Sequence, residues 1–133
     1  MPESAPPQDR YRLNIQVDEE RKTLIARVIG PMPSPVVTAE FMAAYRRIGQ
    51  PWLYNRIIDY RKFTGTIDHV DTEDFMRQWR GLVGDTVHNS KVAFVTDDPL
   101  ELARATTYDH MTADRVRSFT TIDQALEWFQ EAS

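Results

Sequence analysis

The residues of this chain that could do chemistry gather in one polar segment, residues 61–71, and at the end of a later apolar run. The segment supplies cations, hydroxyls, acids and a histidine, and an aspartate closely precedes it. Small-molecule pockets are mostly apolar, so this mixture suits recognition of a protein partner better than enclosure of a ligand. The candidate binding residues are Asp59, Arg61, Lys62, Thr64, Asp68, His69, Asp71, Thr96 and Asp97.

Asp68, His69 and Asp71 form the one cluster that joins a histidine to acids. His69 could act as a general base in a hydrolase or lyase, but the sequence defines no nucleophile beside it. No G-x-S-x-G or S-x-x-K motif occurs. The alternative interpretation is that Asp71 caps a helix and His69 is solvated. We expect no catalytic residue, and the Asp68/His69 enzyme is the weakest of the functional hypotheses.

Metal and cofactor sites have little support in the sequence. His69, His88 and His110 lie in different segments without ligand spacing, and the chain has no cysteine. Asp97 and Asp98 could hold Mg²⁺, or Asp98 could cap a helix that starts at Pro99. Neither a P-loop nor a G-x-G-x-x-G motif is present. We therefore expect no metal and no cofactor.

The bulk properties favour one small domain. The 133 residues suit a single core, and a net charge of −4 disfavours nucleic acid because no basic patch accompanies it. Residues 1–10 contain three prolines and little apolar bulk, which predicts a tail before a domain at 11–133. Without a signal peptide or a membrane-length apolar run, we expect a cytoplasmic protein.

Hydrophobic periodicity predicts the elements that position these residues. Apolar alternation or short apolar runs, bounded by turn residues, indicate strands at Tyr11–Val17, Thr23–Ile29, Arg56–Tyr60, Lys91–Thr96 and Arg115–Phe119. Helical spacing indicates helices that start at Ser34 and Asp71 as N-caps, a helix over Leu100–His110, and one capped by a Thr121–Gln124 capping box. Strands that alternate with helices predict an α/β fold with a mostly parallel five-stranded sheet, to which the first hairpin adds an antiparallel strand.

Three stretches of sequence carry a family resemblance: IIDYRKFTG around Asp59, the strand text KVAFVTD, and the closing VRSFTTIDQALEWF. Together with the N-terminal hairpin they resemble the SpoIIAA-like proteins, a bacterial family related to the STAS domains of anti-sigma-factor antagonists. The resemblance covers nearly the whole chain after the tail. It implies a fold of βα superhelical turns, no enzymatic activity, and the binding of proteins or small ligands.

The resemblance does not extend to the regulatory motif. STAS antagonists carry an Asp-Ser-Ser-Gly type motif whose hydroxyl is phosphorylated, and alignment brings it near Ile67 and Asp68. Here the text reads Asp68-His69-Val70-Asp71, without a neighbouring hydroxyl or glycine. A phosphate beside Asp68 and Asp71 is electrostatically disfavoured. We therefore expect the phosphorylation switch to be lost.

Two main hypotheses follow. The first is a regulatory, non-catalytic interaction module that recognises an unknown protein partner through the polar segment, and it predicts a filled core. The second is a carrier of a small lipophilic ligand, by analogy with the related CRAL-TRIO fold. It predicts a cavity of several hundred Å³ lined by residues such as Phe41, Met42, Met76 and Trp79. A homodimer through exposed helix surface stays open.

Overall fold

The computed structural model describes residues 10–86, 90–98 and 115–131 of the chain. Its sheet has five strands in the order β1-β2-β3-β4-β5. The strands are β1 (Arg12–Asp18), β2 (Thr23–Gly30), β3 (Asn55–Phe63), β4 (Val92–Val95) and β5 (Val116–Phe119). β1 pairs antiparallel with β2, and every later pair is parallel. The predicted α/β fold is confirmed, including the parallel pairing of the segments around Asp59 and Val95.

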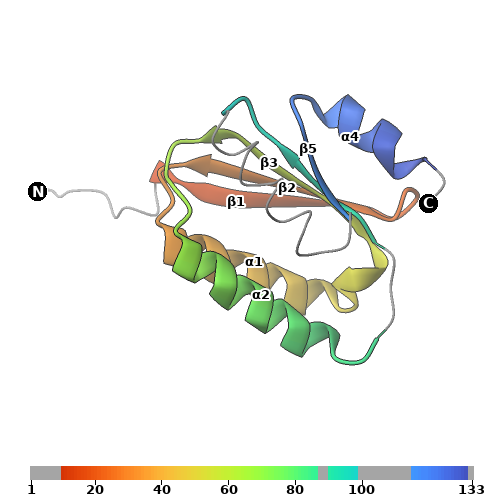
Figure 1. Ribbon diagram of the computed structural model, residues 1–133, viewed down its shortest axis with the longest axis horizontal. Coiled ribbons are helices and arrows are strands. Elements are labelled where there is room, and N and C mark those ends of the chain that lie inside the picture. Colours follow the sequence, from red (N-terminus) through yellow and green to blue (C-terminus); the bar gives the residue numbers. More distant parts are fainter. Residues whose placement is uncertain (1–9, 87–89, 99–114, 132–133) are drawn as a thin grey trace, which may run out of the picture.

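The helices form layers on the two faces of this sheet. They are α1 (Ser34–Ile48), α2 (His69–Val83) and α4 (Ile122–Phe129), and a short 3₁₀ helix, η2 (Pro51–Leu53), precedes β3. Figure 1 shows α1 and α2 together beneath the sheet and α4 on its opposite face. Right-handed crossovers put the helices of successive parallel units on one face, which explains the shared layer of α1 and α2. The helix predicted at Leu100–His110 lies outside the described residues.

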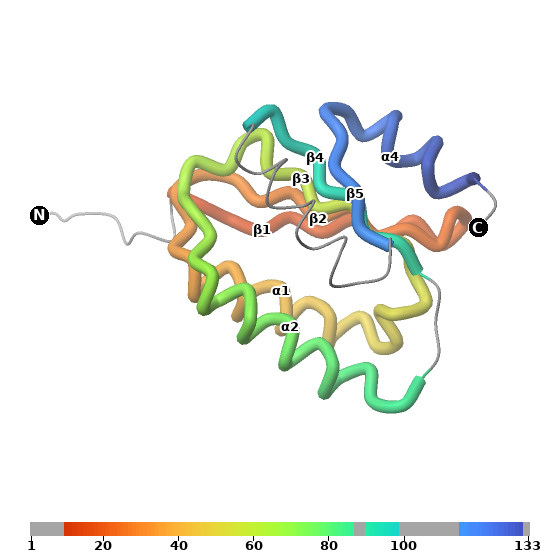
Figure 2. Tube along the Cα trace, viewed as in Figure 1, coloured from red at the N-terminus to blue at the C-terminus, as the bar shows by residue number. Residues whose placement is uncertain are grey.

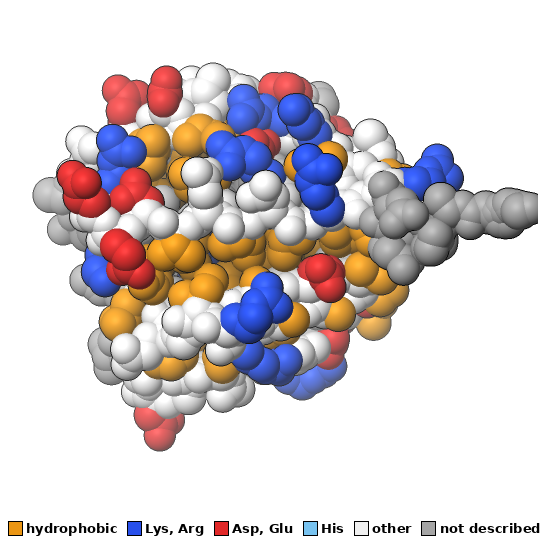
Figure 3. Space-filling view, turned by 180° about the vertical axis from the view of Figure 1, so that it is seen from behind, with side chains coloured by type: hydrophobic (Ala, Val, Ile, Leu, Met, Phe, Trp, Pro, Cys, Tyr) orange, Lys and Arg blue, Asp and Glu red, His pale blue; other side chains and the backbone are white. Residues whose placement is uncertain are grey.

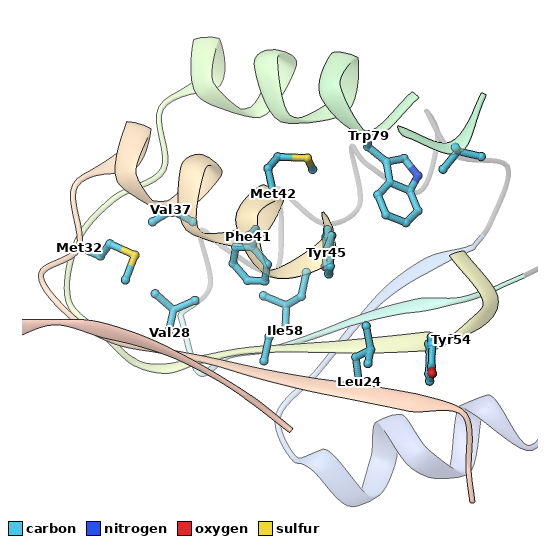
Figure 4. Packing of buried hydrophobic residues seen from close by; sticks show 12 residues of the cluster. Leu24, Val28, Met32, Val37, Phe41, Met42, Tyr45, Tyr54, Ile58 and Trp79 are labelled. Carbon is cyan, nitrogen blue, oxygen red and sulfur yellow. The ribbon is translucent and has the colours of Figure 1, made fainter. Parts of the chain in front are cut away.

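The face of the sheet that α1 and α2 cover holds the larger core cluster. Apolar side chains of α1 recur every three to four residues and turn Phe41 and Tyr45 toward the sheet, while Met42 points toward α2 (Figure 4). Tyr45 meets Trp79 of α2 with their ring centroids 5.4 Å apart and tilted by 65°. Such edge-to-face contacts add to the burial of apolar area. The aromatic contact between Tyr45 and Trp79 thus joins α1 to α2 on this face of the sheet.

The opposite face carries a second, smaller cluster beneath α4. Ile57, Ala93 and Val95 point to this side, because side chains alternate along β3 and β4. Ala125 and Trp128 of α4 cover them. β3 and β4 are therefore buried on both faces, as expected for parallel strands with helices above and below.

Two predicted helix caps are wrong. The N-cap of α1 is Pro33, and the hydroxyl of Ser34 instead accepts a 2.8 Å hydrogen bond from the backbone N–H of Asp68. The N-cap of α2 is Asp68, so Asp71 lies within the first turn. Figure 2 shows the two helix starts side by side at one end of the sheet, which is why Ser34 binds the second helix rather than its own. The capping box of Thr121 and Gln124 is confirmed.

The strand predicted at Arg56–Tyr60 is longer than its apolar run. β3 extends from Asn55 to Phe63, so Arg61 and Lys62 belong to the strand rather than to a loop. Backbone pairing of Lys62 with Ile29 of β2 carries the strand onward, although a register shift interrupts the ladder. The connection between β3 and α2 therefore contains only residues 64–68.

The face of the molecule opposite to that in Figure 1 carries both hydrophobic and charged side chains. Figure 3 shows hydrophobic side chains in a band across the middle of this face, with charged side chains around it. β1 is an edge strand, and its Leu13 and Ile15 are only half-buried against the larger core cluster. None of the helices in the described ranges is both long and apolar enough to cross a bilayer.

The two glycines Gly30 and Gly49 provide a test of how the chain start is held. Both have positive φ, +83° and +73°, so alanine strains the backbone at either place by about 1–3 kcal/mol. A Cβ on Gly30 would lie 2.2 Å from the carbonyl oxygen of Arg10, whereas a Cβ on Gly49 meets nothing within 4 Å. We expect Gly30→Ala to lower the free energy of unfolding more than Gly49→Ala, measured by urea denaturation. Equal losses would show that the close approach of Arg10 contributes nothing.

Candidate functional site

The nine residues predicted to bind a partner do not form one cluster. β3 contains Asp59, Arg61 and Lys62, and the connection after it contains Thr64 and Asp68. The first turn of α2 contains His69 and Asp71, and Thr96 and Asp97 directly follow β4. They share the carboxyl end of the sheet, as predicted, but several are occupied by contacts within the fold. Their role in binding stays a prediction.

Asp59 and Arg61 pair with each other. The carboxylate of Asp59 accepts hydrogen bonds from Nε of Arg61 at 3.0 Å and from Nη2 at 2.9 Å, and from its backbone N–H at 3.0 Å. Nε of Arg27 lies 3.9 Å from the same carboxylate. Burial raises the pKa of Asp59, but the hydrogen bonds and charge of Arg61, with Arg27, outweigh it, so the pKa lies below its usual value. The carboxylate of Asp59 therefore joins Arg61 of β3 to Arg27 of β2.

The remaining predicted residues divide between internal bonds and open surface. Asp71 accepts a hydrogen bond at its backbone carbonyl from the Thr38 hydroxyl, and Thr96 accepts one at its hydroxyl from Asp98 N–H. The side chain of His69 is 80% exposed, and its Nε2 lies 3.7 Å from Glu73. Within the described ranges no three His, Cys, Asp or Glu side chains could together hold a metal ion. His88 and His110 lie outside those ranges.

A pocket that the sequence did not locate lies between α2 and the strands β3, β4 and β5. It has a volume of about 190 Å³ and is partly open to solvent, and we call it the sheet–helix pocket. Its lining comprises Val37, Thr38, Phe41, Arg56, Tyr60, Ile67, Asp71, Thr72, Phe75, Met76, Trp79, Ser90, Val92, Phe94, Arg115 and Val116. Three of the four residues named for a lipophilic cavity are among them, while Met42 is fully buried in the core instead. The volume is below the several hundred Å³ expected.

The floor of the sheet–helix pocket follows from strand register. Arg56 pairs with Val92, and Val92 pairs with Val116, so these three side chains stand in one row across β3, β4 and β5. Neighbours in register on parallel strands point to the same face. The next row on this face begins with Ile58 and Phe94. The pocket floor is therefore apolar except at its Arg56 edge.

Arg56 is the chemically distinctive residue of the pocket. It is 6% exposed, and its guanidinium carbon lies 4.0 Å from the ring centroid of Trp79 and 5.8 Å from that of Tyr45. Burial lowers the pKa of Arg56, and the Tyr45 hydroxyl acts in the opposite direction. An arginine nevertheless stays protonated at neutral pH. The pocket thus contains a buried positive charge stacked on aromatic rings.

Two buried side-chain atoms of the described residues lack a hydrogen-bond partner: Nε of Arg56 and Oγ of Ser118. No ion pair to Arg56 occurs in the described part of the chain. Sequence reasoning assigned Arg56 only to a buried strand. The signal was available, because alternation along β3 places Arg56 on the same face as Ile58 and Tyr60, where a lone cation is out of place.

Comparisons with known proteins inform the fold. No family model matches the chain, and no curated protein does. A solved structure from Shewanella loihica PV-4, described as an uncharacterized protein from the DUF3478 family with a SpoIIAA-like fold, is similar with a TM-score of 0.60. The two share 14% sequence identity over 90% of this chain and 93% of that one. The chain therefore has a SpoIIAA-like fold, as its sequence resemblance indicated.

The Asp59 pair predicts an acid-dependent contribution to stability. Because the pKa of Asp59 is below the usual 3.8, its contribution is present above that value and is lost as the pH falls through the lower, folded-state pKa. We expect Asp59→Asn to lower the free energy of unfolding at pH 7 by about 1.5–3 kcal/mol, the range for hydrogen bonds to charged groups. The difference from wild type shrinks toward pH 3 in urea denaturation.

The matched control for this prediction is Asp85→Asn, the same change at an exposed position just after α2. It should change stability little at either pH. A wild-type advantage over Asp59→Asn that stayed constant or grew in acid would contradict the assignment of this carboxylate to a charged pair.

Proposed function

We propose that this domain is a non-catalytic binding module that takes up one small lipophilic molecule in the sheet–helix pocket. The carrying observation is the pocket itself, an apolar volume of about 190 Å³ between α2 and the sheet. Dry apolar cavities of about 150 Å³ are large enough to bind benzene. The volume therefore fits a single ring or a chain of medium length rather than a phospholipid.

The character of the walls supports a ligand of this class. Phe75 and Met76 of α2 face Val92 and Phe94 of the sheet across the pocket, and all four are only half-buried. Apolar side chains that line a space without filling it gain contacts when an apolar ligand enters. Burial of each methylene is worth about 0.8 kcal/mol. A ligand with a flexible or planar apolar body is thus favoured over a polar one.

No observation favours the other functional hypotheses. The enzyme hypothesis needs Asp68 and His69 to converge in a cleft, but both side chains are exposed and His69 lies next to Glu73. The interaction-module hypothesis rests on the polar segment, where Asp59 and Arg61 bind each other. Recognition of a regulatory protein partner there, the loss of a phosphorylation switch and a cytoplasmic location stay predictions.

The proposal predicts saturable, one-to-one binding of straight-chain alcohols. From 1-hexanol to 1-octanol we expect the affinity to rise about four-fold for each methylene, since about 0.8 kcal/mol is gained per group. Isothermal titration calorimetry measures the series. The Trp79 indole N–H should shift in NMR spectra, because this ring lines the pocket.

A matched pair of variants locates the binding. Val92→Phe places extra volume on the pocket floor and should abolish binding, whereas Val70→Phe makes the same change where the side chain is 68% exposed and should leave it intact. Lack of saturable binding by wild type, or unchanged binding by Val92→Phe, would overturn the proposal. Alcohol-induced shifts at residues remote from Trp79 would overturn it as well.

A further inference from the structure

The sheet–helix pocket contains a positive charge that the described protein does not neutralise. Arg56 is 6% exposed and lines the pocket, yet its Nε has no hydrogen-bond partner. The rings of Trp79 and Tyr45 lie against the guanidinium and attract it through their π faces. The Tyr45 hydroxyl also acts on the guanidinium, but a ring face offers no lone pair, so Nε of Arg56 is left without an acceptor.

Such an arrangement costs free energy in the empty protein. A buried charge is normally paired or hydrogen-bonded, because removal from water is expensive. Asp59 shows how this fold treats a buried charge elsewhere, since its carboxylate accepts three hydrogen bonds from Arg61. Arg56, at the other end of the same strand, has no comparable partner among the described residues. The contrast indicates that an acceptor from beyond the described residues would complete the hydrogen bonding of Arg56 Nε.

The charges around the pocket indicate which kind of group fits. Arg115, which precedes β5, lines the same end of the pocket, because its neighbour Val116 is in register with Val92 and Arg56. The acidic lining residue is Asp71, eight positions before Trp79 on α2 and therefore about 12 Å away along the helix axis. One end of the pocket thus favours an anion, and the apolar floor extends away from it.

We propose that the ligand of this pocket is a small lipophilic carboxylate whose acid group pairs with Arg56. The planar guanidinium matches a carboxylate with two parallel hydrogen bonds. The apolar body then lies along Phe75, Met76, Val92 and Phe94, which line the rest of the pocket. This inference rests on the proposed function, since it names the class of ligand that the same site takes.

The test compares octanoate with 1-octanol, which share a chain length but differ in charge. Calorimetry at pH 8 on the full chain should show octanoate binding at least about ten-fold more tightly, the effect of one hydrogen bond to a charged group. Arg56→Met keeps an unbranched apolar side chain and should remove this preference, so that octanoate binds this variant no more tightly than 1-octanol does. Arg56→Lys keeps the charge without the fork and should retain part of the preference.

Two further measurements separate a loss of ligand preference from a loss of folding in the variants. In wild type labelled with ¹⁵N-arginine, the Arg56 Nε–H resonance should shift on addition of octanoate and not on addition of 1-octanol. Arg56→Met should also leave the thermal midpoint of the empty protein unchanged or raise it, because it removes an unpaired buried charge. A purely structural arginine would instead lower the midpoint.

The outcomes separate this inference from the proposed function. If neither compound binds, the proposed function fails, and the inference fails with it. If both bind equally well, the pocket is a lipophile site and the inference alone is overturned. Acetate is the control for a simple ion effect: acetate that bound as tightly as octanoate would show an anion site without a lipophilic ligand. Octanoate preference that persisted in Arg56→Met would also contradict the role of Arg56.

Discussion

Strand β3 is the middle of the sheet, and its parallel register with β2 and β4 constrains everything on both faces. Its side chains alternate, so Arg56 and Ile58 face α1 and α2 while Ile57 and Asp59 face the side of α4. A slip of one residue would exchange these two sets, moving Arg56 from the pocket to the opposite core. The register of β3 thus places the cation in the pocket and the Asp59–Arg61 pair outside it.

The two charged residues of β3 illustrate opposite solutions to burial. Asp59 is bound by Arg61, two residues further along the strand and on the same face, so this charge is satisfied within the chain. Arg56 is satisfied only in part, by the rings of Trp79 and Tyr45. Local strain or unmet polarity persists where the surrounding structure holds it, and such places are often functional. Among the described residues, an external hydrogen-bond acceptor would therefore stabilise the fold most at the Arg56 end of the pocket.

The fold was predictable because it depends on local patterns. Alternation in the first hairpin, the apolar run before Thr96 and the capping box at Thr121 each specify their element without reference to the rest. The caps at Ser34 and Asp71 were mispredicted because the two helix starts lie together, and Ser34 binds across the gap to Asp68. A sequence shows a capping residue, but not which neighbouring helix competes for its hydroxyl.

The candidate site was only partly predictable. Three of the lining residues, Phe41, Met76 and Trp79, were named from their helical faces, but the pocket depends on how far α2 stands from the sheet. That distance is set by side chains from several elements together. Arg56 was assigned to a buried strand, but its role was missed because the sequence does not show which side chains meet its charge. Its burial depends on Trp79 of α2 and Tyr45 of α1, which come to lie against it only in three dimensions.

The central claim is that an open apolar volume exists between α2 and β3, β4 and β5. Xenon tests it most directly, because this atom enters dry apolar cavities without any specific recognition. NMR spectra of the full chain under xenon pressure should show saturable shifts centred on Phe75, Trp79, Val92 and Phe94, which line the pocket. Shifts that were absent from these residues would mean that the space is filled by the protein's own chain, and would contradict the account.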